Sequence, residues 1–375
     1  MRNVRKAYCA VAVICATVAV MSVGGFTPQK ANAAVSQTWI DEQVSFISTH
    51  QLASGAILST DTKINPYFAN DATLGLIKAN TTTSKSAAYK WMTWYLGHLN
   101  AAATSVPGNS VFDYTYDQTT GIESSTGNFD SVDSYASTTL NVAYAAWQSG
   151  DTALRNLVTA NIASYEAIAN VLNYSAPQGV RIATGSSAGL TIAKPSYAIA
   201  YTMDNVEVFS GLRDFAALEG ALGRTSQQSY YSSWADTSKS SILAKLWNPT
   251  NNNWDWAYGN TSNTGVFYAQ ATAQVWPIIF GVVDPTDPKA IAGWNAFTAA
   301  WPTWYNNGIP DGFPWVSIAR ASQIMGDTTH ATASLTDIRN RYAPNFTAPT
   351  SCGATSCGNW YDNEAGWFIQ AALKI

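Results

Sequence analysis

The sequence contains twelve segments with helical periodicity, and two kinds of segment alternate along the chain. In the odd-numbered segments apolar residues recur three and four positions apart, which predicts helices with one buried face and one exposed face. The even-numbered segments carry apolar and small residues on every side, which predicts helices that are buried all round. The predicted amphipathic helices are 38–52, 86–100, 152–174, 227–247, 288–305 and 329–342, and the predicted buried helices are 66–80, 130–149, 204–222, 268–282, 314–325 and 363–373.

This alternation predicts an all-α fold in which helix pairs close into a ring. Six buried helices inside six amphipathic ones, joined as consecutive hairpins, form an (α/α)6 toroid. A right-handed stack of helix pairs is the alternative, but the last buried helix is as apolar as the first, which favours a closed ring. We expect the long connections to lie at one mouth of the ring, where the buried helices begin, with short β-hairpins in 111–117 and 179–194.

Residues 1–33 are predicted to be a secretory signal peptide. Arg2, Arg5 and Lys6 precede the uncharged apolar run 7–23, and Ala31-Asn32-Ala33 has the small-x-small pattern of a signal-peptidase site. A membrane anchor is the alternative, but the apolar run is short for one. We therefore expect a secreted, extracellular protein whose residues 34–375 form a single domain.

The composition disfavours several classes of partner. Without the four basic residues of the signal peptide, 16 Lys and Arg face 24 Asp and Glu, a formal charge of −8. Nucleic acids and anionic membranes call for basic patches, so we expect neither as a partner. The 15 Trp and 19 Tyr suit neutral ligands rich in hydroxyl groups, although part of this aromatic content must serve the core. We expect a monomer that needs no cofactor.

Two cysteines, Cys352 and Cys357, follow the signal peptide, in the sequence SCGATSCG. In an oxidising compartment they predict a disulfide that closes a small loop. A zinc site would need further ligands, and none of the three His residues has metal-ligand spacing. We therefore predict no metal bound by His or Cys.

Pairs of acidic residues occur where three of the predicted buried helices begin. These pairs are Asp130/Asp133, Asp204/Glu207 and Asp362/Glu364. Carboxylates there can simply cap a helix, because its first turn offers free N–H groups and the positive end of the helix dipole. Asp130 is at the expected N-cap, and Asp204 with Glu207 has the spacing of a capping box. Three such pairs at one predicted mouth nevertheless indicate a functional cluster.

Two of these helix starts carry a resemblance to a known superfamily. FDSVDSYASTTLNVAYAAW, residues 129–147, resembles the Asp-rich helix start followed by A-Y-A and Trp in bacterial endoglucanases and chitosanases. TMDNVEVF, residues 202–209, is similar to a helix start with Asp in unsaturated glucuronyl hydrolases. With the helix count and alternation, the chain resembles the six-hairpin glycosidase superfamily over nearly all of 34–375. The endoglucanase pattern also has a Glu at the second helix, where this chain reads INPYFAN, so that acid cannot be carried over.

The resemblance implies hydrolysis of a glycosidic bond, which uses one protonated and one ionised carboxyl group. Asp133 and Asp204 match the resembled motifs best, and Glu207 is the next candidate. We predict that one of these three donates a proton and that another acts as the base. Further residues near the same helix starts are predicted to bind substrate, the aromatic ones by stacking on sugar rings: Asp130, Tyr67, Trp254, Trp256, Asp311, Trp315, Tyr361, Asp362 and Glu364.

Three other functions compete with a glycosidase that acts on an extracellular poly- or oligosaccharide. GSSAG at 185–189 fits the G-x-S-x-G motif of serine hydrolases, but that motif must lead into a helix. Here LTIAKP follows, which predicts a hairpin turn. Polysaccharide lyases also use helical toroids but often depend on His, Tyr or Arg, and the chain has only three His. A non-catalytic glycan-binding protein would keep the aromatic residues and tolerate loss of the carboxylates.

Overall fold

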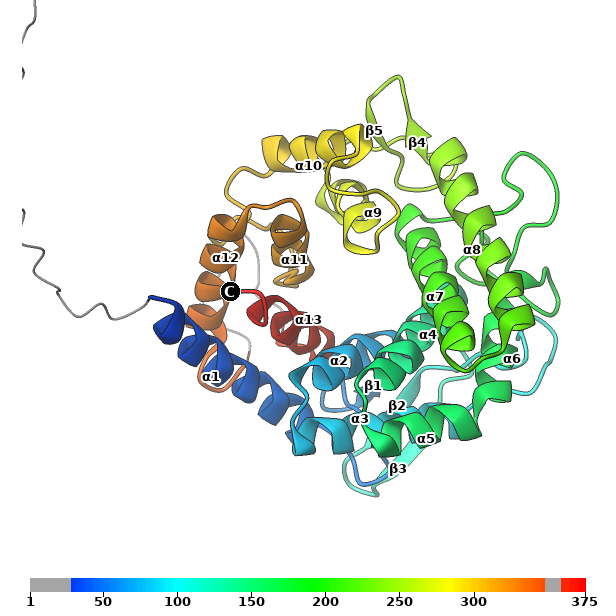
Figure 1. Ribbon diagram of the computed structural model, residues 1–375, viewed down its shortest axis with the longest axis horizontal. Coiled ribbons are helices and arrows are strands. Elements are labelled where there is room, and N and C mark those ends of the chain that lie inside the picture. The colour runs from blue at the N-terminus through cyan, green and yellow to red at the C-terminus, as the bar shows by residue number, and fades with distance from the viewer. Residues whose placement is uncertain (1–27, 348–358) are drawn as a thin grey trace, which may run out of the picture.

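The computed structural model describes residues 28–347 and 359–375, in which helices form two concentric rings (Figure 1). The inner ring consists of α2 (Pro66–Ala79), α4 (Val132–Gln148), α7 (Thr202–Ala221), the irregular segment 267–279, α11 (Ser317–Ile324) and α13 (Asp362–Ala372). The outer ring consists of α1 (Pro28–Thr49), α3 (Thr82–Gly97), α5 (Thr152–Ala160) with α6 (Ile162–Asn173), α8 (Thr225–Lys245), α10 (Pro288–Ala300) and α12 (Thr328–Tyr342). The predicted (α/α)6 toroid is confirmed.

Glycines close the ring between its last and first inner helices. A Cβ atom on Gly366 of α13 would lie 2.2 Å from the carbonyl oxygen of Asp71 in α2, and one on Gly75 would lie 2.6 Å from Cα of Gly366. The two backbones therefore touch where these residues cross, which only glycine permits. This contact between α2 and α13 excludes the open stack of helix pairs.

Two predicted helix starts are confirmed by their caps. Asn65 caps α2, its Oδ1 accepting a hydrogen bond of 3.1 Å from the backbone N–H of Phe68. Asp287 caps α10, its Oδ1 accepting a bond of 2.8 Å from the backbone N–H of Lys289. Proline opens each of these helices, where no N–H donor is needed.

The acidic pairs do not cap their helices as the sequence predicted. The N-cap of α4 is Ser131 and not Asp130, and its hydroxyl accepts the N–H of Ser134. The N-cap of α7 is Tyr201, which makes no side-chain capping bond, so Asp204 and Glu207 form no capping box. Their side chains are free to serve another purpose.

Two predicted helices are broken. The helix predicted over 152–174 divides at Asn161, whose side-chain amide donates to the carbonyl oxygen of Leu157 and so competes with the helical ladder. The helix predicted over 268–282 is instead an irregular turn, Phe267–Ala271, in which Tyr268 and Ala269 have non-helical backbone angles, then a 3-10 turn, Thr272–Gln274, and the short α9, Trp276–Ile279. Pro277 has no N–H to continue the ladder from the preceding turn.

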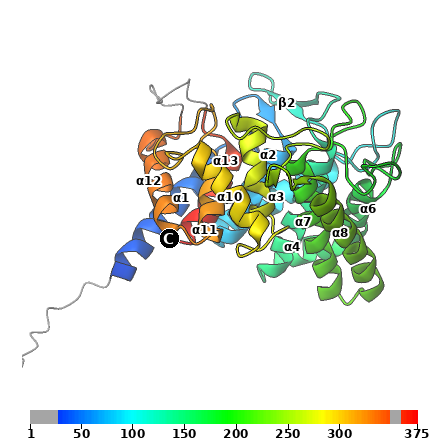
Figure 2. The same cartoon turned by 90° about the horizontal axis from the view of Figure 1, so that it is seen from above.

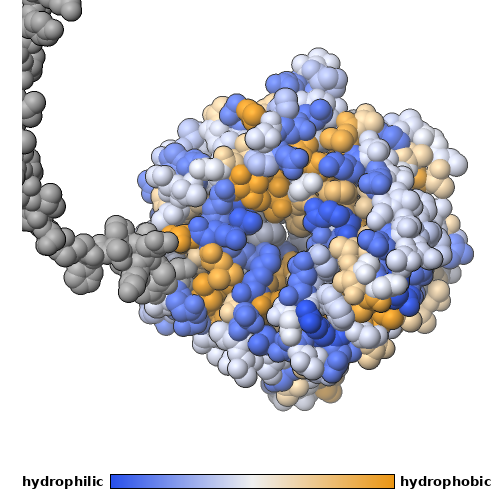
Figure 3. Space-filling view, viewed as in Figure 1, coloured by the Kyte–Doolittle hydropathy of each residue, from blue (hydrophilic) through white to orange (hydrophobic). Residues whose placement is uncertain are grey.

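The connections into the inner helices gather at one mouth, as predicted. They include the antiparallel sheet of β1 (Lys63–Ile64), β2 (Tyr114–Asp117) and β3 (Ile122–Ser125) and the hairpin of β4 (Trp247–Asn248) and β5 (Asn253–Trp254). Figure 2 shows β2 at the upper edge with most of these connections. On the face turned to the viewer in Figure 3, the centre of the ring is hollowed, and both hydrophilic and hydrophobic residues border the hollow.

The GSSAG segment is a turn, which confirms the prediction. Arg181 pairs with Thr191 across it, and the next helix begins only at Thr202. The strand–turn–helix geometry of a serine-hydrolase nucleophile is therefore not formed.

Two sequence predictions fall largely outside the described residues. These are the disulfide between Cys352 and Cys357 and most of the signal peptide 1–33, whose last residues belong to α1.

No helix in the described ranges is long and apolar enough to span a bilayer. One continuous apolar core fills the space between the two rings.

Candidate active site

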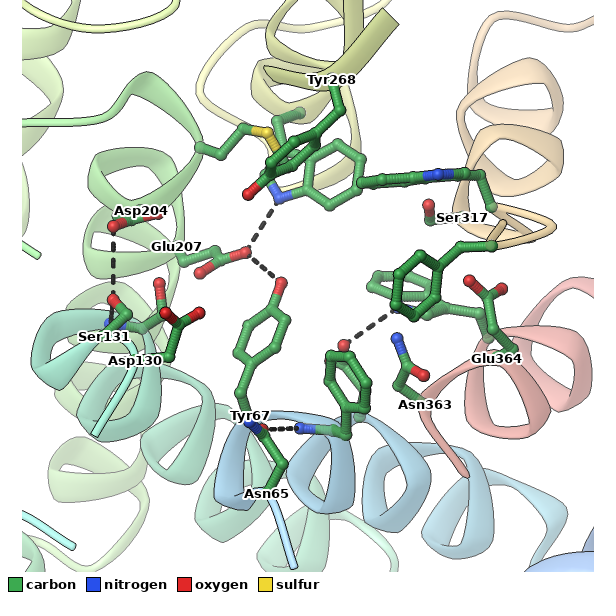
Figure 4. Close-up of a pocket in the computed structure, with 18 of the residues that line it drawn as sticks. Asn65, Tyr67, Asp130, Ser131, Asp204, Glu207, Tyr268, Ser317, Asn363 and Glu364 are labelled. Atoms are coloured by element: carbon green, nitrogen blue, oxygen red, sulfur yellow. Dashed lines mark hydrogen bonds between the residues drawn. The ribbon is translucent and has the colours of Figure 1, made fainter. Parts of the chain in front are cut away.

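A pocket of about 320 Å³ opens where the inner helices begin (Figure 4). The acidic residues that line it are Asp71, Asp130, Asp204, Glu207, Asp311 and Glu364. The aromatic residues that line it are Tyr67, Phe68, Tyr135, Tyr268, Trp276, Phe313, Trp315 and Trp367. No Lys, Arg or His of the described chain belongs to this lining. Each carboxyl group therefore lacks a cationic partner in the pocket, and each disfavours ionisation of the others.

Glu207 lies in α7, one helical turn after Asp204, so both side chains reach the same face. Its Oε1 accepts hydrogen bonds from the hydroxyl of Tyr67, at 2.6 Å, and from Nε1 of Trp276, at 2.9 Å (Figure 4). Burial raises the pKa of Glu207 to about 7, although these hydrogen bonds favour the ionised form. Glu207 is thus a firmly oriented carboxyl group that titrates near neutral pH.

Asp204 lies in the first turn of α7 and is half-buried in the pocket wall. Its Oδ2 is 3.3 Å from the hydroxyl oxygen of Ser131. Burial, and then the negative charges of Asp133 and Glu207, raise the pKa of Asp204 well above its usual range. Asp204 therefore keeps its proton to a higher pH than an ordinary aspartate does, which suits a general acid.

Asp133, the other leading candidate, is completely buried behind Ser131 and does not line the pocket. Its Oδ1 accepts the hydroxyl of Ser131 at 2.7 Å and the backbone N–H of Ser134 at 3.1 Å, and its Oδ2 accepts the hydroxyl of Thr191 at 2.7 Å. Burial raises the pKa of Asp133 to about 6. A carboxylate in this position cannot touch a molecule in the pocket.

Glu364 lies in the first turn of α13, across the pocket from Asp204 (Figure 4). Its Oε2 accepts the backbone N–H of Val316 at 2.8 Å, immediately before α11. Burial raises the pKa of Glu364 to about 7. Its neighbour Asp362 is fully buried outside the pocket, and burial raises the pKa of Asp362 to about 8.

The structure brings only some of the predicted substrate-binding residues together. Asp130, Tyr67, Asp311, Trp315 and Glu364 line the pocket, whereas Trp254, Trp256, Tyr361 and Asp362 do not. Trp254 is fully buried against Trp247, and Trp256 packs beside Tyr201, with ring centres 5.6 Å apart. Tyr361 stacks on the pocket residue Phe313, with ring centres 4.7 Å apart.

Trp315 has a backbone conformation that is unusual for a large side chain. Its φ is +51°, in the left-handed region, which a bulky residue adopts only where its surroundings impose it. Its ring packs against Trp276 and Tyr268, with centres 5.7 and 5.5 Å away. This strained position holds an indole in the pocket wall, next to rings contributed by the irregular segment 267–279.

Comparisons with known proteins show a match at the level of fold. No protein-family model and no curated protein sequence matches the chain. A structure described as a wild-type glycosidase is 13% identical with a TM-score of 0.58, covering 92% of this chain and 98% of its own. A GH63 mannosylglycerate hydrolase from Thermus thermophilus is 10% identical with a TM-score of 0.60, covering 88% and 99%. A Streptococcus pneumoniae metal-independent α-mannosidase, complexed with α-1,6-mannobiose, is 9% identical with a TM-score of 0.60, covering 92% and 96%.

The chain has the six-hairpin glycosidase fold. The matches extend over almost all of both chains, so the fold that the sequence resemblance implied is confirmed. At these identities the six-hairpin glycosidase fold is all that the similarity establishes, and the chemistry must be argued from the pocket.

Sequence reasoning missed several residues of this six-hairpin pocket, among them Asp71, Tyr268 and Trp276. Asp71 is buried, and its Oδ2 accepts Nε1 of Trp367 at 3.0 Å, while burial and Glu207 raise the pKa of Asp71 well above its usual range. Asp71 could have been found from the sequence, because it lies four residues after Tyr67 and therefore on the same face of an otherwise apolar helix. Tyr268 and Trp276 lie in the irregular inner segment, and no sequence pattern distinguished them from residues of the core.

Within the described residues, no three His, Cys, Asp or Glu side chains converge in a way that could hold a metal ion.

Proposed function

We propose that this protein is a glycoside hydrolase in which Asp204 is the general acid and Glu364 the general base. One observation carries the proposal: carboxyl groups from α7 and α13 stand on opposite sides of one pocket, in a fold shared with glycosidases (Figure 4). Cleavage of a glycosidic bond needs a pair of carboxyl groups that flank the bond, one protonated and one ionised.

Asp204 is suited to the role of general acid. Because its pKa is raised well above the usual range, Asp204 keeps its proton at a pH where an ordinary aspartate has lost it. In the proposed step the O–H bond of Asp204 breaks, and the proton goes to the glycosidic oxygen as the bond from that oxygen to the anomeric carbon breaks.

Glu364 is suited to the role of general base. Its pKa of about 7 makes it available as a carboxylate from neutral pH upward, and the N–H of Val316 holds one of its oxygens in place. In the proposed step Glu364 takes a proton from a water molecule as that water attacks the anomeric carbon. A base that activates water, on the side of the pocket opposite the acid, implies that hydrolysis inverts the anomeric configuration.

The pocket favours a neutral or basic sugar over a uronic acid. A uronate would bring a carboxylate into a lining that has six carboxyl groups and, within the described chain, no Lys, Arg or His. This argues against the lyase alternative, because polysaccharide lyases act on uronates and must neutralise that carboxylate. The aromatic rings of Tyr67, Tyr268 and Trp315 offer apolar faces to sugar rings, and the carboxyl groups can accept hydrogen bonds from sugar hydroxyls.

The experiment is a panel of glycans incubated with the purified chain. The panel should contain α-mannosides and glycerate glycosides, because matched structures act on or hold such compounds, together with neutral, amino and uronic acid polysaccharides. New reducing ends without ultraviolet absorbance support hydrolysis, and absorbance from an unsaturated uronide indicates a lyase. Retention of a glycan on an affinity gel, without cleavage by fresh enzyme, indicates a binding protein. Asp204→Asn provides the inactive control.

The proposed hydrolase acts outside the cell on a poly- or oligosaccharide. This part of the proposal depends on the signal peptide predicted at 1–33. N-terminal sequencing of protein from the medium should begin at Ala34 if export and cleavage occur as predicted.

A further inference from the structure

The hydroxyl oxygen of Ser131 lies among three polar groups. It is 2.7 Å from Oδ1 of Asp133, 3.3 Å from Oδ2 of Asp204 and 3.4 Å from the backbone nitrogen of Ser134. A serine hydroxyl has one proton to donate and two lone pairs that accept. Ser131 can therefore donate to only one of the two carboxyl groups at a time.

Asp133 is the group that receives this proton in the resting enzyme. Ser131 is closer to it, and every other hydrogen bond to Asp133 also comes from a donor, the N–H of Ser134 and the hydroxyl of Thr191. Three donors stabilise the ionised form of a carboxyl group. The buried guanidinium of Arg181 adds a positive charge nearby.

The contact between Ser131 and Asp204 then has one consistent interpretation. With its own proton directed at Asp133, the Ser131 oxygen can only accept, so Asp204 must donate. The three neighbours of Ser131 then match its capacity of one donated and two accepted hydrogen bonds.

We propose that Ser131 and Asp133 are positioning residues which hold the acid proton on Asp204, through the chain Asp204 O–H to Ser131 O–H to the Asp133 carboxylate. The reason is a count of hydrogen bonds. When Asp204 is protonated this chain contains two bonds, whereas when Asp204 is ionised the single Ser131 proton can serve only one of two carboxylates. Hydrogen bonding therefore favours the protonated form of Asp204. The catalytic meaning of this chain rests on the proposed function.

The surrounding charges act in the same direction. Three carboxyl groups face that of Asp204: Asp133 of α4, Asp130 of the loop before α4, and Glu207 of α7 itself. Three phenol groups also face it: Tyr67 of α2, Tyr201 immediately before α7, and Tyr268 of the irregular segment 267–279. The carboxylates among them disfavour a charge on Asp204. The hydroxyl of Ser131 is uncharged, so a variant that lacks it tests the hydrogen bond to Asp204 without changing any charge around Asp204.

The same hydroxyl can serve both stages of proton transfer. Rotation of the Asp204 carboxyl about its last side-chain bond, which is a soft torsion, turns the acid proton from Ser131 toward a bound glycosidic oxygen. After the proton has left, the Ser131 hydroxyl can turn to donate to the new Asp204 carboxylate. Asp133 then retains the donors Ser134 and Thr191.

The test replaces Ser131 and follows the alkaline limb of the pH–rate profile, where the acid loses its proton. Ser131→Ala and Ser131→Gly should each move this limb to lower pH by about one unit or more, the size of a hydrogen bond to a charged group. Ser131→Thr keeps the hydroxyl and should keep the wild-type limb. Asp287→Ala removes the N-cap of the outer helix α10 and should lower the melting temperature without moving the limb.

A readout without substrate separates this inference from the proposed function. Carbon-13 labelling of the aspartate carboxyls allows the titration of Asp204 to be followed by NMR, with its signal identified from Asp204→Asn. The resonance should titrate at lower pH in Ser131→Ala than in the wild type, whether or not a substrate is known. An unchanged titration in both Ser131→Ala and Ser131→Gly would overturn the proposal. A shifted titration in a protein that cleaves no glycan would support the relay and count against the proposed hydrolase.

Discussion

The hydroxyl of Tyr67 in α2 donates a 2.6 Å hydrogen bond to Oε1 of Glu207 in α7, and so joins two inner helices across the pocket. The two helices are far apart in sequence, and α4 lies between them in the ring (Figure 1). The bond makes the pocket geometry depend on contacts that only the closed toroid supplies.

Tyr67→Phe should lower the free energy of unfolding by about 1–3 kcal/mol, because it removes a hydrogen bond to an ionisable carboxyl group. Glu207 has a pKa of about 7, so it is ionised above that pH and makes the stronger bond there. Denaturant unfolding at pH 8.5 and pH 5.5 measures the difference, and the loss should be larger at pH 8.5. An equal loss at both pH values would show that the ionised form of Glu207 gains nothing from Tyr67.

The stability of the ligand-free protein should fall as the pH rises from about 4 to about 8. Burial raises the pKa of Glu207 and Glu364 to about 7 and that of Asp362 to about 8, whereas in the unfolded chain such groups ionise near pH 4. Between these values the folded state binds more protons, so stability is highest at the acidic end and is lost as these groups ionise. Calorimetry should give a higher melting temperature at pH 5 than at pH 8.5, and Asp362→Asn should show a smaller fall. A melting temperature that rises over this range contradicts the burial of these acids.

Gly366→Ala should destabilise the ring at its closure. The added Cβ would lie 2.2 Å from a backbone oxygen of α2, which cannot move without shifting that helix, so a loss of about 1–3 kcal/mol or more is expected. Gly97→Ala is the matched control, because a Cβ there meets no atom within 4 Å. Thermal denaturation of both variants measures the difference. Equal melting temperatures would mean that α2 and α13 do not cross at Gly75 and Gly366.

The disulfide between Cys352 and Cys357 stays a prediction from the sequence. Mass spectrometry of the secreted protein, alkylated before and after reduction, should find no free thiol at either position. Its reduction should change the melting temperature little, because a loop this short constrains the unfolded chain weakly. Two alkylated cysteines in unreduced protein would refute the bridge.

The fold was predictable because the alternation of apolar and amphipathic helices repeats six times. A ring of helix pairs is the arrangement that buries every apolar helix, and errors at single boundaries do not alter it. The break at Asn161 and the irregular turns before Pro277 depend on local competition for backbone hydrogen bonds, which periodicity does not report.

The candidate site was predictable only in part, and the start of α4 shows why. The sequence placed the N-cap at Asp130, but it is Ser131. Each residue along a helix turns the side chain by about 100°, so a shift of one position changes which acid faces the pocket. Asp133 is buried behind the wall, and Asp130 lies at the pocket. The pairing of Asp204 with Glu364 joins residues 160 positions apart, and only ring closure brings them to one pocket.

The proposed hydrolysis depends most directly on Asp204 as the acid and Glu364 as the base. The decisive measurement is the initial rate of hydrolysis of a glycan from the panel by Asp204→Asn, Glu364→Gln and wild type, with Asp284→Asn on the outer surface as the control. Asn and Gln keep the size of the side chain but transfer no proton, so each pocket variant should lose about 10²–10⁴-fold in rate, while its melting temperature should not fall below that of the wild type. Asp284→Asn should match the wild type in both. Folded Asp204→Asn and Glu364→Gln variants that keep rates within about tenfold of the wild type would contradict the assignment of this pair as acid and base.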